Sequence, residues 1–190
     1  MHADFRVLLD ACVMAPHGLC DLFLRLAETP RLYVPCWSAR ILDEVQRVQT
    51  DRLEPPWPKP RSDHWRREVE AAFPEAIVEG YEPLTAVLGN SEGDRHVLAA
   101  AIRGDADVIV TFNTRDFPAD SLAPWGIAAN HPSEYLNVLF SIDPVVFVSK
   151  LEQIATCRRQ SLEEVVSRLS KTVPTFAQNV ASQIGLRLPA

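Results

Sequence analysis

Short apolar runs alternate with longer segments of helical periodicity over most of the chain. Runs of this length that are bounded by turn residues are typical of buried strands. Because helical segments separate them, the strands are expected to lie parallel in one sheet. The runs are Phe5 to Leu9, Leu32 to Pro35, Val108 to Thr111 and, more weakly, Ile127 to Ala129.

Apolar residues recur every three or four positions between these runs, which predicts amphipathic helices. These helices are expected over residues 17–28, 39–50, 65–73 and 91–103. After residue 133 the pattern is helical alone, over 133–140, 144–155, 162–171 and 174–184. Helix ends are marked by the expected N-caps Ser38, Asp143 and Ser161 and by Gly104. The pattern predicts an α/β domain over residues 1–135 and a helical extension over residues 136–190.

Composition and charge are those of an ordinary globular protein. Of the 190 residues 47% are hydrophobic and 23% are charged, which excludes a disordered chain. No apolar run of about 18 residues predicts a membrane span. The N-terminus lacks signal-peptide features, and four cysteines without CxxC spacing are expected to be free thiols in the cytoplasm. The net charge of −6 argues against non-specific duplex binding through a basic surface.

Two acids directly follow predicted strands. Asp10 ends the first apolar run, and Asp116 lies in the loop after the strand that ends at Thr111. Ligand-binding groups of α/β proteins gather at this carboxyl edge of the sheet. A turn or a helix cap is an equally weighted alternative for Asp10. Asp105 and Asp107 precede the strand and are therefore expected to be turn acids at the other edge.

Two adjacent acids in the helix over 39–50, Asp43 and Glu44, point in different directions. At about 100° per residue, Glu44 lies in the same row as Ile41 and Val48, at the edge of the apolar face. Asp43 points nearly opposite and is expected to be a solvated surface acid. Glu44 is thus a candidate ligand, and a surface pair with Arg40 is the alternative.

The segment SEGDRHVLAAA places Asp94 in the first turn of a helix, in line with the apolar residues Val97, Leu98 and Ala101. A lone carboxylate that faces the core is costly, so Asp94 is a candidate ligand. The alternative is a cap, because Ser91 and Asp94 are close to a capping box. Glu92 could assist at the rim, whereas His96 is expected to be structural or solvated.

The loop from Asp51 to Asp63 is rich in proline, and it leads into a segment where aromatic and basic residues mix. The residues concerned are Trp57, Lys59, Arg61, His64, Trp65, Arg66 and Arg67. This composition suits single-stranded nucleic acid. The favoured interpretation is nevertheless a connector whose tryptophans pack against the body of the domain.

Four carboxylates are therefore expected at one edge of the sheet: Asp10, Glu44, Asp94 and Asp116. Like charges about 4 Å apart repel by roughly 4 kcal/mol at an effective dielectric near 20, so the cluster needs protonation, basic partners or a cation. All-oxygen ligands suit Mg²⁺ or Mn²⁺, and a carboxylate-held ion suits phosphodiester hydrolysis by activated water. The sequence has no Walker lysine loop and no GxGxxG, and it lacks the paired acids of dehalogenase-type phosphatases and receiver domains.

The segments that hold these acids resemble the PIN domain, most closely the VapC-like toxin ribonucleases of type II toxin–antitoxin pairs. The segments are LLDACV with Asp10, SARILDEV with Glu44, GDRHVLAAA with Asp94 and VTFNTRDFP with Asn113 and Asp116. The resemblance covers about the first 135 residues. It implies a three-layer α/β/α fold with a central parallel sheet and a Mg²⁺- or Mn²⁺-dependent endoribonuclease.

The resemblance also implies roles and partners. It assigns catalytic metal-ligand roles to Asp10, Glu44, Asp94 and Asp116, and a positioning role to Asn113; Thr111 is expected to help position the substrate, and Glu92 is a possible auxiliary acid from its place at the rim. It implies an RNA substrate, a cognate antitoxin protein and a homodimer. Many relatives have Asn, Ser or Thr near the position of Cys12, and a thiol there is expected to support Asp10 poorly.

Two other functions remain open. A catalytically silent PIN-like module could use the acidic pocket to bind a basic partner, although the complete set of acids argues against it. A DNA-directed, structure-specific nuclease would share the chemistry, but the acidic net charge and the lack of a long basic arch disfavour it.

Overall fold

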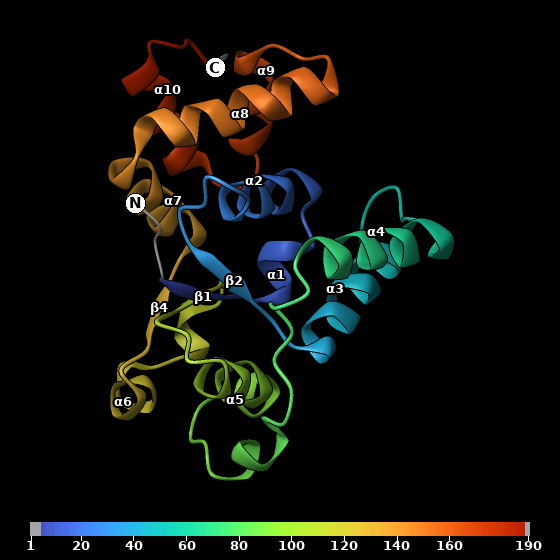
Figure 1. Cartoon of the computed structure of the whole chain (residues 1–190), viewed down its shortest axis with the longest axis vertical. Coiled ribbons are helices and arrows are strands. Elements are labelled where there is room, and N and C mark those ends of the chain that lie inside the picture. The colour runs from blue at the N-terminus through green and yellow to red at the C-terminus, as the bar shows by residue number, and fades with distance from the viewer. Residues whose placement is uncertain (1–4, 189–190) are drawn as a thin grey trace.

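The computed structural model describes residues 5–188 and places a parallel four-stranded sheet at the centre of the molecule (Figure 1). The strand order is β2-β1-β3-β4, and all three pairings are parallel. The strands are β1 (Arg6–Leu9), β2 (Val34–Cys36), β3 (Val108–Val110) and β4 (Ala128–Asn130). The side chains of Leu8, Leu9, Ile109 and Val110 are fully buried, as expected for strands covered on both faces. The four predicted strands are confirmed.

Helices cover both faces of the sheet. In Figure 1, α2 (His17–Ala27) and α7 (Pro132–Ile142) lie on one side of the sheet and α5 (Arg95–Arg103) on the other. The arrangement has three layers and confirms the predicted α/β/α fold. Gly104 ends α5 as predicted. A Cβ atom there would lie 2.7 Å from Val78 Cγ2 and 3.0 Å from the Ala100 carbonyl oxygen, so only glycine fits without displacement.

A long helical hairpin projects beside the sheet. It consists of α3 (Ala39–Asp51) and α4 (Lys59–Ala72). The Ser38 side chain accepts a hydrogen bond from Ile41 N, which confirms the predicted N-cap. Helix α4 begins six residues before the predicted start at Trp65, because Pro60 lies at the second helical position, where the missing N–H costs nothing.

The C-terminal helices pack against one another and against α2. Besides α7 they are α8 (Pro144–Arg158), α9 (Leu162–Leu169) and α10 (Pro174–Ile184). Asp143 and Ser161 are N-caps as predicted, and Ser161 forms a full capping box with Glu164. Helix α7 runs through residue 135, and the division of the chain into residues 1–135 and 136–190 stays a prediction.

Short elements complete the chain. They are α1 (Ala11–Met14), η1 (Glu82–Ala86), η2 (Glu92–Asp94), η3 (Thr114–Asp116), α6 (Ala119–Leu122) and η4 (Ala123–Trp125). Outside the four strands, Ile77 forms a single parallel bridge with Trp37. The four cysteines are free thiols, as predicted. Across residues 5–188, no helix has the length and apolar character that a membrane crossing requires.

Candidate active site

The register of the sheet brings Asp10 and Thr111 together. Leu9 pairs with Val110, and the Asp10 N–H donates to the Val110 carbonyl oxygen at 3.1 Å. Asp10 and Thr111 are therefore the first residues beyond their strands, at the same carboxyl edge. This is the edge at which the sequence predicted ligands.

Asp10 is held by two side-chain donors and is 5% exposed. Its Oδ2 accepts a hydrogen bond from Thr111 Oγ1 at 2.6 Å and one from Cys12 Sγ at 3.0 Å. Asp10 occupies the N-cap position of α1 but makes no side-chain cap, so the capping alternative is wrong. Its second oxygen, Oδ1, takes part in no hydrogen bond with any residue from 5 to 188.

Cys12 supports Asp10 more directly than the sequence predicted. Burial, followed by the nearby charge of Asp10, raises the pKa of Cys12 to about 12. The thiol therefore keeps its proton near neutral pH and can donate it to Asp10. The Phe112 N–H donates in turn to Cys12 Sγ at 3.4 Å. The expectation of poor support was wrong because it considered the thiol without the loop that orients it.

Thr111 acts on Asp10 and not on a surface that a substrate could reach. Its side chain is fully buried, and its hydroxyl oxygen accepts a hydrogen bond from Asn113 N at 3.0 Å while donating to Asp10. Because Thr111 is buried, we expect it to influence a substrate through Asp10, and its role in substrate positioning stays a prediction. Asn113, in contrast, is exposed next to it.

Asp94 lies close enough to two other candidate acids to be perturbed by them. Burial raises the pKa of Asp94 above its ordinary value, and the charges of Asp10 and Asp116 raise it further. The Asp94 side chain makes no cap for α5, and Ser91 makes none for η2, so the capping alternative is not observed. Within residues 5–188, no Lys or Arg forms an ion pair with Asp10, Asp94 or Asp116.

Glu44 approaches the site from α3 and is held by two basic side chains. Its Oε1 lies 3.4 Å from Arg40 Nε and 3.3 Å from His96 Nε2. Burial alone would raise the pKa of Glu44, but His96 and Arg40 outweigh it, so that the pKa is lower than usual. The predicted alternative, a pair with Arg40, is thus present, and the contact with His96 adds a link to α5.

His96 is the residue that the sequence interpretation undervalued. It is 3% exposed and joins two parts of the site. Its Nδ1 lies 2.9 Å from the Gly93 carbonyl oxygen and donates to it, whereas Nε2 faces Glu44 without meeting hydrogen-bond geometry. The available signal was a histidine two residues after a candidate acid, in the first turn of the same helix.

Three of the remaining acids, Asp43, Asp105 and Asp107, lie where the sequence predicted them. Asp43 is exposed and pairs with Arg66. Asp107 accepts a hydrogen bond from Arg6 N at 2.8 Å, at the amino edge of the sheet, and Asp105 adopts a left-handed φ of 49° there. Glu92 is exposed at the start of η2, and its auxiliary role stays a prediction.

The donor set suits a hard divalent cation. Carboxylate oxygens without paired thiolates are the ligands that Mg²⁺ and Mn²⁺ prefer, and Asp94 feels two like charges that a cation would offset. Over the part of the chain that the structure describes, no three His, Cys, Asp or Glu side chains are already grouped as a metal cluster. Asp94 and Asp116 are only half-buried, which leaves their carboxylates room to rotate.

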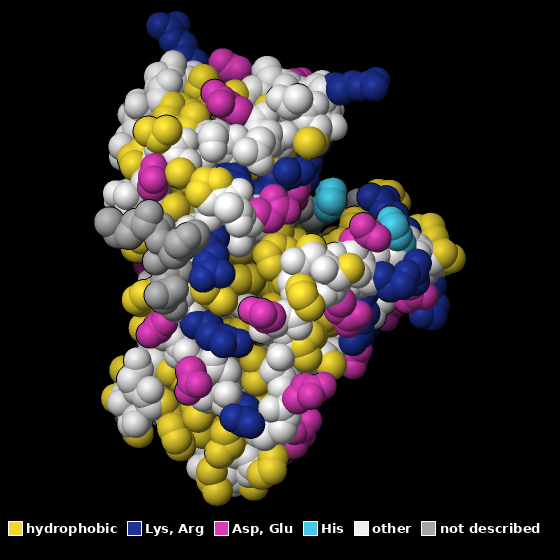
Figure 2. Space-filling model, in the orientation of Figure 1, with side chains coloured by type: hydrophobic (Ala, Val, Ile, Leu, Met, Phe, Trp, Pro, Cys, Tyr) yellow, Lys and Arg dark blue, Asp and Glu magenta, His cyan; other side chains and the backbone are white. Residues whose placement is uncertain are grey.

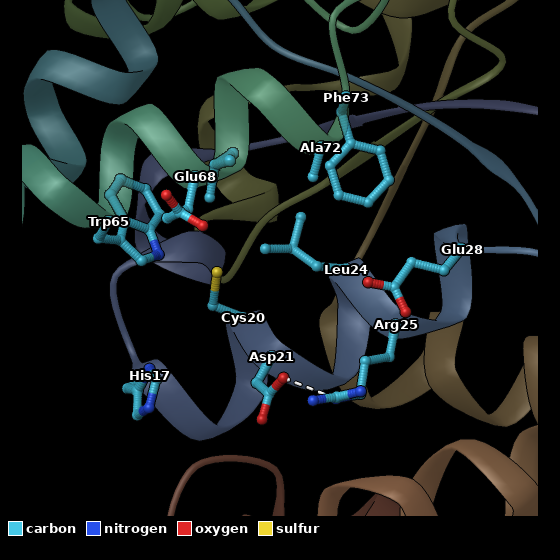
Figure 3. A pocket seen from close by; sticks show the side chains of 11 residues that line it. His17, Cys20, Asp21, Leu24, Arg25, Glu28, Trp65, Glu68, Ala72 and Phe73 are labelled. Atoms are coloured by element: carbon cyan, nitrogen blue, oxygen red, sulfur yellow. Dashed lines mark hydrogen bonds and ion pairs between the residues drawn. The ribbon is translucent and has the colours of Figure 1, made fainter. Parts of the chain in front are cut away.

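A separate cleft lies between α2 and α4 (Figure 3). It has a volume of about 260 Å³, and its apolar lining includes Leu24, Val69, Trp65 and Phe73. The ion pair between Asp21 and Arg25, with Oδ1 and Nε 2.9 Å apart, lies along the α2 side. None of the four candidate acids lines this cleft.

The PIN domain family matches residues 4–115, which is more than half of the chain. The chain belongs to the PIN domain family. The resemblance predicted from the four acidic segments is thereby confirmed. Three of the four candidate acids, Asp10, Glu44 and Asp94, lie within the matched residues. The fourth, Asp116, is the first residue after the match.

A curated relative of this PIN domain chain is named "Putative ribonuclease VapC50" and comes from Mycobacterium tuberculosis (strain ATCC 25618 / H37Rv). The two proteins are 51% identical over 61 residues, which is 32% of this chain and 36% of the relative. The match thus spans about a third of the relative's length. No solved structure matches this chain significantly.

Proposed function

We propose that this PIN domain protein is a Mg²⁺- or Mn²⁺-dependent endoribonuclease that hydrolyses RNA phosphodiester bonds. The observation that carries the proposal is that burial and the carboxylates of Asp10 and Asp116 raise the pKa of Asp94 at the carboxyl edge of the sheet, and that none of the three has a Lys or Arg partner among residues 5–188. Such crowding of like charges is typical of a site that a cation completes. The similarity to a relative named as a ribonuclease supports RNA as the substrate.

In this proposal Asp10, Glu44, Asp94 and Asp116 hold the metal. When bound, Mg²⁺ or Mn²⁺ supplies an activated water and neutralises charge that develops on the phosphate. The chain's own contribution is to hold two of these ligands in place. Thr111 and Cys12 fix one oxygen of Asp10, and Arg40 with His96 keeps Glu44 ionised. The exposed Asn113 contacts the substrate, and Glu92 assists at the rim.

We further propose that the protein is the toxin of a type II toxin–antitoxin pair and acts in the cytoplasm. The similarity to the VapC-named relative supports this role, and four free thiols suit a reducing compartment. The proposed partners are a cognate antitoxin encoded next to this gene and a second copy of the chain. A small adjacent gene for a DNA-binding protein would support the pairing.

The nuclease proposal is tested by RNA cleavage with purified protein. Cleavage is expected only with added Mg²⁺ or Mn²⁺, and Asp10→Asn or Asp94→Asn should lower the rate by at least about 100-fold. Asp43→Asn is the matched control, because Asp43 is an exposed acid next to Glu44 in sequence that pairs with Arg66. It should leave the rate unchanged.

Each other outcome has a clear meaning. Full activity of both Asp10→Asn and Asp94→Asn would contradict the site assignment. Failure of the wild type to cleave RNA, combined with tight binding of the neighbour-encoded protein, would favour a catalytically silent binding module. Cleavage of branched DNA in preference to RNA would favour the structure-specific DNA nuclease.

A further inference from the structure

Three side chains from two distant segments form an aromatic and basic cluster at the tip of the α3–α4 hairpin. Trp57 lies in the loop between the helices, and Arg61 Cζ is 4.0 Å from the centroid of its ring. The ring of His17, at the start of α2, meets the Trp57 ring edge to face, with centroids 5.6 Å apart and planes at 71°. Trp57 is half-buried, whereas Arg61 and His17 are exposed.

The hairpin tip is basic in an otherwise acidic protein. The segment from Arg47 to Arg67 contains six Lys and Arg against three Asp and Glu, although the whole chain carries a net charge of −6. Figure 2 shows basic and histidine side chains on the lobe that α3 and α4 form, interspersed with acidic ones. Among residues 5–188 the Arg61 guanidinium takes part in no ion pair, so its charge is available to a ligand.

Charges around His17 are also predominantly positive. Burial lowers the pKa of His17, and Arg158 and Arg61 lower it further against the opposing effect of Asp21. Asp21 itself is paired with Arg25 and with Arg158, whose Nη2 lies 2.7 Å from Asp21 Oδ2. The negative charge of Asp21, the acid that acts on His17, is therefore already balanced by these two arginines.

The cluster lies near enough to the candidate active site for one single-stranded nucleic acid to contact both. Helix α2 follows α1, which begins directly after Asp10, and α1 packs against α3. From Glu44 to the end of α3 at Asp51 the helix rises by about 10 Å. A nucleic acid bound at the acids would need to extend a few nucleotides along α3 to reach the tip.

We propose that Arg61, Trp57 and His17 form a second contact site for the single-stranded RNA substrate, beyond the cleavage position. The proposal rests on the nuclease function proposed above. Trp57 holds the guanidinium plane of Arg61, an unstacked base packs on the exposed face of that plane, and the Arg61 N–H groups contact the adjacent phosphate. His17 closes the other side of the Trp57 ring.

A single strand suits this cluster better than a duplex. Bases in a single strand are free to stack on aromatic or guanidinium planes, whereas those in a duplex are not. Duplex binding relies mainly on many phosphate contacts, which the net charge of −6 disfavours. The guanidinium of Arg61 on the Trp57 ring, and not its charge alone, therefore favours a single-stranded nucleic acid as the ligand.

The test measures the affinity of the Asp94→Asn protein for single-stranded RNA of about four and about twelve nucleotides over a range of salt concentrations. Trp57→Ala and Arg61→Gln should each weaken binding of the longer RNA by about fivefold or more. Arg61→Gln should also reduce the salt slope by about 0.7, the value for one lost phosphate contact. Arg61→Lys should weaken binding but keep the slope, because it keeps the charge and loses the plane.

Matched controls come from the opposite edge of the sheet. Trp125 is 43% exposed and Arg103 is exposed, so Trp125→Ala and Arg103→Gln should not change RNA binding. The four-nucleotide RNA should lose less affinity in the Trp57 and Arg61 variants than the longer RNA, because it contacts the acids and the tip together less completely. Both Arg61 substitutions alter an exposed side chain, which keeps the test valid even if Trp57→Ala fails to fold.

The outcomes separate this proposal from the nuclease proposal. If Arg61→Gln and Arg61→Lys bind the longer RNA as tightly as the controls do, the second contact site is wrong, whether or not the wild type cleaves RNA. If these variants lose affinity but the wild type cleaves no RNA with Mg²⁺ or Mn²⁺, the contact site stands and the nuclease proposal fails.

Discussion

His96 joins two segments that carry candidate ligands. It contacts the Gly93 carbonyl oxygen next to Asp94 through Nδ1, and it faces Glu44 of α3 through Nε2. Its burial at 3% exposure fixes both contacts. We infer that His96 is a positioning residue that sets the distance between Asp94 and Glu44.

Two amide substitutions separate the contacts of His96. The side-chain nitrogen of Asn can replace Nδ1, whereas that of Gln can replace Nε2. If the contact with Glu44 matters for metal binding, His96→Asn should weaken Mn²⁺ affinity by about tenfold, and His96→Gln should weaken it clearly less. Calorimetric titration with Mn²⁺ measures both, with circular dichroism as the check on folding. Equal Mn²⁺ affinity of His96→Asn and the wild type would contradict this role.

The sequence named four candidate acids, whose role stays a prediction, but not the side chains that contact them. Asp10, Glu44, Asp94 and Asp116 could be named, because each was expected at a strand end or on an inward helix face. Their supports could not, because Thr111 reaches Asp10 through strand pairing across 101 positions, and His96 reaches Glu44 across two helices. Contacts of this kind depend on tertiary packing, and periodicity contains no information about it.

At the scale of elements, one buried lysine anchors the C-terminal helices to the PIN domain. Lys150 of α8 is 1% exposed. Its Nζ donates to the carbonyl oxygens of Glu28 at 3.2 Å and Thr29 at 3.1 Å, at the C-terminal end of α2. A cation at this end also interacts favourably with the helix dipole. The contact ties α8 to the end of α2 through two hydrogen bonds.

Lys150→Met should destabilise the protein, because methionine keeps the apolar stem but leaves both carbonyl oxygens without this donor. The expected loss is about 2 kcal/mol of unfolding free energy, or a Tm lower by roughly 4–8 °C for a chain of this size. Thermal unfolding followed by circular dichroism measures it. Lys171→Met, at an exposed position, should leave the Tm unchanged, and an equal Tm for both variants would contradict the anchoring role.

Element boundaries were predictable where local chemistry sets them. Ser38, Asp143 and Ser161 accept backbone hydrogen bonds as N-caps, and Gly104 ends α5. The start of α4 was misplaced because a proline-rich segment predicts a loop, although Pro60 fits the first turn. Packing against α3 favours the helix over the loop, because Ser62 in its first turns is buried and donates a hydrogen bond to Gln49 Oε1 at 2.7 Å.

At the scale of the whole molecule, the helices after residue 135 share a core with the PIN domain. Helices α8 and α9 pack on α2, and Tyr135 packs against Tyr33 with ring centroids 6.2 Å apart. We therefore expect the chain to unfold in one cooperative transition. The helical extension would then be a permanent part of the domain surface.

Tryptophan fluorescence and far-UV circular dichroism test this expectation, because Trp37, Trp57, Trp65 and Trp125 all precede residue 136. Fluorescence reports the first part of the chain, whereas circular dichroism also reports the C-terminal helices. The two thermal transitions should coincide in their midpoints. Separate midpoints would indicate that residues 136–190 unfold independently.

The concentration of basic residues at the hairpin tip makes the molecule electrically asymmetric. The segment from Arg47 to Arg67 carries six Lys and Arg against three Asp and Glu, whereas the whole chain has a net charge of −6, and this separation of charge turns the molecule as it diffuses toward a polyanion. Long-range fields of this kind raise encounter rates most strongly at low ionic strength. An RNA would therefore tend to meet the hairpin tip first, so that the orientation of the encounter is selected before any contact with the acids forms.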